Sequence, residues 1–247
     1  LIHEQDFYDL TWAYLTKVNS ENVVHVEVFF DPQTHTDRGV PFDIVIKGIY
    51  RALEKAKAEF NMSYKLIMSY LRHLSEEEAF KTLESSIPYK DWIDGVGLDS
   101  SELGNPPNKF ENVFKASAEQ GYKLAAHAGE EGPVEYIWEA INLLNVDRID
   151  HGNRCLDDEK LVQVLIEKNM GLTLCPLSNV ELKVIQKMEE HPVLKMLEKG
   201  LLATIHSDDP AYFGGYMNEN YLETAKALNL TEAHLMQLAI NAFEASW

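Results

Sequence analysis

Short apolar runs alternate along the chain with longer segments in which apolar residues recur every three or four positions. The longer segments have the spacing of amphipathic helices, and the first of them covers residues 6–18. Strands that alternate with helices are typical of an α/β protein with a parallel sheet. The short runs predict seven strands, over residues 23–30, 64–71, 93–98, 123–127, 148–151, 171–175 and 202–206.

Several of these runs are apolar without polar alternation, as in Val23-Val24, Leu66-Ile67-Met68 and Leu124-Ala125-Ala126. A strand that is covered on only one face alternates between apolar and polar residues, whereas a parallel strand covered on both faces does not. The pattern therefore predicts buried parallel strands.

Polar and ionisable residues gather at the C-terminal end of nearly every predicted strand, among them Asp31, Asp99, His127, His151 and Asp208. A doubly wound sheet concentrates such residues at one switch point, whereas a (β/α)8 TIM barrel draws its active site from all strand ends. We therefore expect residues 1–247 to form a single barrel domain. Because a barrel has eight strands and the pattern gives seven, we expect the first strand to precede Leu1 and to be missing from this chain.

Composition narrows the classes of partner. The chain of 247 residues has 22 Lys+Arg and 40 Asp+Glu, which gives a net charge of −18. Such an acidic surface repels phosphate backbones, so we expect no nucleic-acid partner. We also expect no membrane partner, since no apolar run is long enough to span a bilayer. Two cysteines are too few for a disulfide framework. These features predict a cytoplasmic protein. If the source is a eukaryote, the nucleus is an alternative location.

The segment from His127 to Pro133 is the richest in candidate chemistry. His127 can offer a neutral nitrogen to a metal, and Glu130, beyond a glycine, can place a carboxylate over the same site as a proton carrier. The alternative is a core histidine followed by an acidic first helical turn. His151, at the end of the next predicted strand, is either a second imidazole of this site or a structural residue.

Asp208 and Asp209 are adjacent carboxylates at the end of the last predicted strand. Such a pair repels itself unless a cation or a ligand with several donors compensates. A cation bound by one aspartate and a substrate bound by the other would explain both. The alternative is an acidic helix N-cap that is closed by Pro210.

Taken together, the strand ends resemble the adenosine deaminase family of the amidohydrolase superfamily. The resemblance is carried by HAGE at 127–130, DHG at 150–152, CPLSN at 175–179 and SDDP at 207–210, in family order. It is closer to the adenine deaminase branch through FFDPQTHT at 29–36, LRHLSEEEA at 71–79, GLDSSE at 97–102 and SDDPAYFGGY at 207–216. The resemblance implies a zinc-dependent hydrolysis of adenine to hypoxanthine and ammonia in purine salvage, with one Zn²⁺ per subunit.

The family's residue roles transfer only to matching positions. His127 and Asp208 resemble zinc ligands, Glu130 resembles the proton shuttle to the purine, and His151 resembles the residue that orients the attacking hydroxide. Asp209 resembles the partner of the substrate N7. The resemblance therefore implies a small purine as the partner, and it leaves a homo-oligomer open.

Two departures from the family pattern stand out. The family's first strand carries a His-x-His pair of zinc ligands, and no such pair occurs in this sequence. His206 stands where most relatives are expected to have Asn, so it either reaches the metal region or packs as a structural residue.

The choice of a free base over a nucleoside depends on Ser101 and Glu102. Related nucleoside deaminases have a glycine near this point, which leaves room for ribose, whereas Glu102 would fill that space and accept a hydrogen bond from an N–H of adenine. The alternative is that Glu102 is a solvated loop acid before Pro106-Pro107. Adenosine deamination is the nearest alternative function. A non-catalytic purine-binding or assembly protein is the alternative from another class, because two metal ligands are absent.

Overall fold

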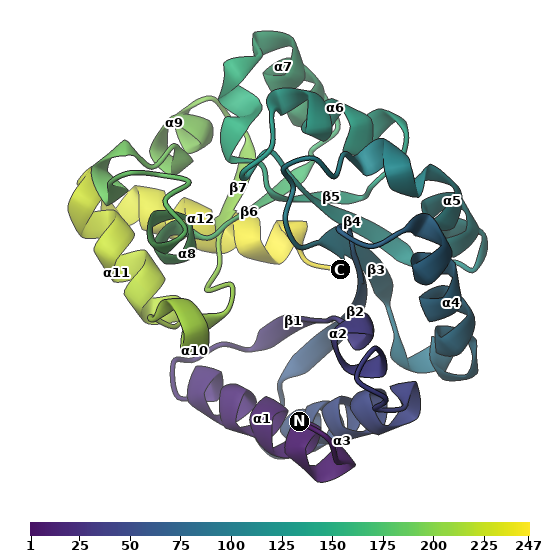
Figure 1. Ribbon diagram of the computed structural model, residues 1–247. Coiled ribbons are helices and arrows are strands. Elements are labelled where there is room, and N and C mark those ends of the chain that lie inside the picture. Colours follow the sequence, from purple (N-terminus) through teal and green to yellow (C-terminus); the bar gives the residue numbers. More distant parts are fainter. The chain divides into compact units, whose positions relative to one another are not determined.

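The computed structural model describes residues 1–247 (Figure 1). The chain divides into two compact units. The first unit contains Leu1–Ser100 and Phe110–Leu124, and the second contains Ser101–Lys109 and Ala125–Trp247. None of the helices is long and apolar enough to cross a membrane.

In the first unit, strands β1, β2 and β3 and the beginning of β4 pair in this order, and all pairs are parallel. The elements are α1 (Glu4–Asn19), β1 (His25–Phe30), α2 (Pro32–Thr36), α3 (Phe42–Phe60), β2 (Ser63–Leu71), α4 (Glu76–Ser86), η1 (Ile87–Trp92), β3 (Gly95–Asp99) and α5 (Glu111–Glu119), followed by β4 (Lys123–Ala128), whose later residues belong to the second unit.

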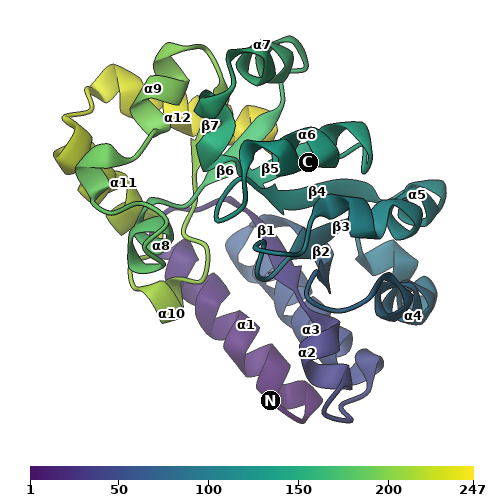
Figure 2. The same ribbon diagram turned by 45° about the horizontal axis from the view of Figure 1, so that its top comes forward.

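Helices α1 and α3 lie side by side in both views of the first unit (Figures 1 and 2). They approach closely at Gly48, where an added Cβ would overlap the main-chain oxygen of Glu4 and lie 2.7 Å from the Cβ of Phe7. Helix α3 ends at Phe60, and the cap residue Asn61 has a left-handed backbone (φ 54°) that turns the chain toward β2. Asparagine tolerates this conformation better than most residues, which explains why the helix stops there.

In the second unit, the rest of β4 pairs with β5, followed by β6 and β7, again all in parallel. Helix α12 packs against β7. The elements are η2 (Pro107–Phe110), α6 (Val134–Asn142), β5 (Arg148–His151), η3 (Asn153–Asp157), α7 (Glu159–Glu167), β6 (Gly171–Leu174), α8 (Pro176–Glu181), η4 (Met188–Glu190), α9 (Val193–Glu198), β7 (Leu202–Ile205), α10 (Pro210–Phe213), α11 (Met217–Leu228) and α12 (Glu232–Ala245).

All seven predicted strands are present, with ends that shift by no more than two residues. The expectation of full burial is confirmed for β2 and β4, where Leu66, Ile67 and Ala126 are buried. It is wrong for the first run, because Val24 is exposed and β1 is only partly buried. The reason is that β1 lies at the edge of the strand order, with β2 as its single neighbour.

Candidate active site

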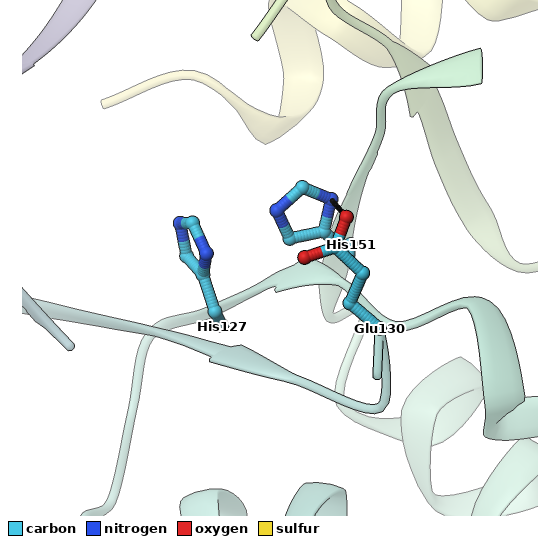
Figure 3. Close-up of side chains that lie close together, drawn as sticks. All are labelled: His127, Glu130 and His151. Atoms are coloured by element: carbon cyan, nitrogen blue, oxygen red, sulfur yellow. Dashed lines mark ion pairs between the residues drawn. The ribbon is translucent and has the colours of Figure 1, made fainter. Parts of the chain in front are cut away.

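Three side chains of the second unit, those of His127, Glu130 and His151, point toward one another (Figure 3). His127 lies in β4, His151 is the last residue of β5, and Glu130 lies in the loop after β4. The imidazole centroids are 4.5 Å apart, and the metal-binding atoms of all three residues lie within 4.8 Å of one another. The fold thus brings two histidines and the glutamate together.

Glu130 lies in a loop and is not part of the helix that follows it. Helix α6 begins only at Val134, so the acidic residue of its first turn is Glu135. The alternative interpretation of Glu130, as a carboxylate that serves a helix dipole, therefore does not fit the structure.

Burial changes the proton equilibria of Glu130 and His151. The two residues are 8% and 2% exposed, and Nδ1 of His151 lies 3.4 Å from Oε1 of Glu130. Burial raises the pKa of Glu130, an effect that charge on His151 opposes and that nearby carboxylates reinforce. Burial lowers the pKa of His151, but the surrounding carboxylates, Glu130 foremost, outweigh it and raise that pKa. A glutamate that keeps its proton to higher pH is suited to donate it to a substrate.

His151 and Asp208 both have a left-handed backbone, with φ of 63° and 55°. Each non-glycine residue held in this region costs about 1–3 kcal/mol, a cost that proteins typically accept at functional sites. The two positions are among nine non-glycine residues with positive φ, and the sequence singled out both of them.

A second cluster contains His151, Cys175 and Asp208, whose metal-binding atoms also lie within 4.8 Å of one another. The hydroxyl of Ser178 donates a 2.6 Å hydrogen bond to Oδ2 of Asp208. The two expected ligands, His127 and Asp208, thus belong to different clusters that share His151. Imidazole nitrogens and carboxylate oxygens are donors that Zn²⁺ prefers, so the residues present fit such an ion.

Glu102 has a different environment from the one expected. Its side chain is buried, with 1% exposure, and its carboxylate accepts three backbone N–H groups of the loop after β4. The Oε2 atom accepts from Gly129 at 3.1 Å and from Gly132 at 2.7 Å, and Oε1 accepts from Glu130 at 3.1 Å. Glu102 thus anchors the loop that carries Glu130, and its role in substrate selection stays a prediction.

The close approach of Glu102 also explains the glycine at position 132. A Cβ at Gly132 would overlap Oε2 of Glu102. Glycine at this position therefore allows the loop to fold around the carboxylate.

We expect Glu102→Gln to destabilise the protein, because a glutamine replaces one acceptor oxygen with an N–H₂ group that faces backbone donors. Each buried N–H left without an acceptor costs about 1–3 kcal/mol in the free energy of unfolding, which urea denaturation measures. Glu139→Gln is the matched control, since Glu139 accepts the backbone N–H of Asn108 at 3.1 Å in an exposed place. Equal unfolding free energies for the two variants would contradict the anchoring role.

Ser101 and Asp209 are both exposed. Asp209 is the N-cap residue of α10, but its side chain makes no capping hydrogen bond, so the helix-cap interpretation lacks its characteristic contact. The main-chain oxygen of Ser101 accepts a hydrogen bond from Asn105. Contact of either residue with a substrate stays a prediction.

His206 is half-buried, and its ring contacts the side chain of Thr204. Its Nε2 lies 2.6 Å from Oγ1 of Thr204, whose hydroxyl donates to the main-chain oxygen of Leu172 at 2.8 Å. Because the hydroxyl proton of Thr204 is donated to Leu172, Oγ1 of Thr204 accepts a hydrogen bond from Nε2 of His206.

Sequence reasoning assigned no role to Asn179 and His191, which contact the site. Nδ2 of Asn179 donates to Oε1 of Glu130 at 2.8 Å, and Nε2 of His191 lies 3.2 Å from Oδ1 of Asn179. The CPLSN motif contained Asn179, but no pattern in the sequence pointed to its partner His191.

Comparison with known proteins defines the class. The adenosine deaminase family matches residues 1–247, and the chain therefore belongs to this family. A curated relative named adenine deaminase, from Marinomonas sp. (strain MWYL1), is 58% identical over 247 residues, which are 100% of this chain and 74% of the relative.

Two solved structures are similar over the whole chain. The adenine deaminase of Arthrobacter aurescens has a TM-score of 0.98 and 44% identity, and the match covers 100% of this chain and 76% of that one. An amidohydrolase of Burkholderia ambifaria with bound zinc has a TM-score of 0.94 and 28% identity, and the match covers 100% and 70%.

These similarities confirm the expected family and the expected class of hydrolytic deaminases. They also confirm an α/β fold of the TIM-barrel amidohydrolase type. The alternative of a non-catalytic protein depended on the absent His-x-His pair, and the identity to named deaminases weighs against it. The single-domain expectation stays a prediction.

Proposed function

We propose that this protein hydrolyses free adenine to hypoxanthine and ammonia and serves purine salvage. The observation that carries the proposal is the identity of 54–58% to proteins named adenine deaminase, over 98–100% of this chain. The cluster of His127, Glu130 and His151 supports it, because it combines metal-binding nitrogens with a buried acid in one place.

In this proposal His127 and Asp208 hold one Zn²⁺ per subunit. Zinc bound there would act as a Lewis acid and lower the pKa of the attacking water toward about 7. The fit is supported by the donor chemistry of the two clusters and by the zinc in the Burkholderia ambifaria structure.

The other side chains bind the purine and move protons. Glu130, protonated, donates to N1 of adenine as C6 becomes tetrahedral, and the ring then carries less charge. His151 orients the attacking water toward C6, and Asp209 is the hydrogen-bond partner of N7. The amino group leaves as ammonia. Ser101 contacts the substrate in this proposal.

We also place the protein in the cytoplasm. Cys155 and Cys175 are both buried and unbridged, which fits a reducing compartment. Burial raises the pKa of Cys155 to about 12, so this thiol stays protonated and unreactive.

Parallel assays of ammonia release from adenine and adenosine test the proposal with the full-length protein. We expect kcat/KM for adenine to exceed that for adenosine by about 10²-fold or more, the ratio attainable when a site pairs with a polar group that only one substrate has. Equal or higher kcat/KM for adenosine would overturn the choice of the free base. Absence of ammonia release from both would overturn the proposal as a whole.

A further inference from the structure

A buried chain of hydrogen bonds runs from Glu130 away from the two site histidines. Asn179, on α8, donates from Nδ2 to Oε1 of Glu130 at 2.8 Å. His191, just after η4, faces Oδ1 of Asn179 through Nε2 at 3.2 Å. The backbone N–H of Val193, at the start of α9, donates to Nδ1 of His191 at 3.3 Å. The three side chains that these hydrogen bonds connect are all buried, with Asn179 at 0% and His191 at 3% exposure.

The direction of each of these hydrogen bonds follows from the last one, which the backbone N–H of Val193 makes. A backbone N–H can only donate, so Nδ1 of His191 accepts from Val193 and carries no proton. A neutral imidazole then has its proton on Nε2, which donates to Oδ1 of Asn179. The amide of Asn179 is thereby oriented with Nδ2 toward Glu130. Burial lowers the pKa of His191 to about 3, so the imidazole is neutral under ordinary conditions.

The orientation of the Asn179 amide makes the two oxygens of the Glu130 carboxyl group different. Oε1 receives the N–H of Asn179 and lies 3.4 Å from Nδ1 of His151. Figure 3 shows the other oxygen of Glu130 on the side of His127. An oxygen that already accepts the N–H of Asn179 is the poorer place for a proton, because the proton would replace an acceptor with a competing donor.

We propose that His191 and Asn179 are positioning residues that keep Oε1 of Glu130 as an acceptor and so place its transferable proton on Oε2, toward His127. This inference rests on the proposed role of Glu130 as proton donor to the purine. His191 acts through Asn179 and touches no substrate, and Asn179 acts through the direction of its amide. The pair thus presents the acid in one orientation before the substrate arrives, which lowers the cost of reaching the reactive geometry.

The first test measures the proton on His191 directly in the unmodified full-length protein. Long-range ¹H–¹⁵N correlation spectra of ¹⁵N-histidine-labelled protein distinguish the two neutral tautomers, and the signal that disappears in His191→Gln identifies the residue. We expect the Nε2–H tautomer and no protonation between pH 6 and pH 8. An Nδ1–H tautomer, or a charged imidazole, would overturn the chain of donors whatever the activity.

The second test compares substitutions by their effect on adenine turnover. His191→Leu keeps the bulk but removes the donor, whereas His191→Gln keeps an N–H toward Asn179. We expect His191→Leu and Asn179→Asp to lower kcat by about 10- to 100-fold with KM changed less than threefold, which is the usual size for residues that orient a catalytic group. We expect His191→Gln to recover most of the lost kcat.

Equal kcat values for His191→Leu and wild type would overturn the positioning role, and so would a loss confined to KM. If the variants fail to fold, the tautomer measurement still decides the direction of the bonds. If the wild-type protein does not deaminate adenine, the proposed function fails, and the tautomer result stands separately.

Discussion

Replacing Glu130 by glutamine should reduce kcat for adenine by about 10²-fold or more while leaving bound zinc in place. The reduction is the range typical of a general acid–base group. Glutamine has nearly the same shape and cannot carry a transferable proton. It retains an oxygen to accept the N–H of Asn179, so the buried contact at 2.8 Å can persist. The measurement is steady-state ammonia release together with zinc content by atomic emission.

Glu135→Gln provides the matched control for this experiment. Glu135 is exposed in the first turn of α6, five residues further along the chain, and loses the same charge on substitution. We expect its turnover to equal that of wild type. Turnover of Glu130→Gln near the wild-type value would show that Glu130 is only a structural residue, since its burial and hydrogen bonds would be preserved in both proteins.

His127→Ala should lose zinc and activity together, and more activity than Glu130→Gln. The imidazole supplies one of the nitrogens within 4.8 Å of Glu130 and His151, and alanine offers no ligand in its place. Glu130→Gln by contrast removes a proton but leaves the ligands intact. The two variants thus separate metal binding from proton transfer, and zinc content after dialysis is the measurement that does so.

The control for His127→Ala is His25→Ala. His25 is the first residue of β1, and its Nδ1 lies 2.7 Å from Oγ of Ser63, far in sequence from the site. We expect this variant to keep both zinc and activity. Stoichiometric zinc in dialysed His127→Ala would remove His127 from the metal ligands and would leave Asp208 and its neighbours to hold the ion.

The site residues differ in how visible they are in the sequence. His127 and Glu130 are three positions apart at one strand end, and His151 ends the next strand, so local pattern and strand order were enough to predict that they lie close together. The buried environment that raises the pKa of Glu130 was not predictable in this way, because it depends on what packs around the loop.

Glu102 shows that some contacts leave no trace in the sequence. A glutamate between an exposed serine and an exposed leucine has the pattern of a solvated loop or of a substrate contact. In the structure its carboxylate is buried and accepts hydrogen bonds from backbone N–H groups that lie 27 to 30 residues further along the chain. Backbone donors carry no sequence signature, so the three hydrogen bonds could be found only in three dimensions.

By itself, the sequence determined the seven strands and their order, the family, and the set of residues at the strand ends. It could do so because burial of parallel strands leaves a periodic apolar pattern, and because the motifs are short and local. The tertiary structure alone decided how Glu130 is held: by Glu102 from the backbone side and by Asn179, 49 residues away, from the side-chain side. These contacts depend on the direction of hydrogen bonds between distant segments, and only a folded chain fixes that direction.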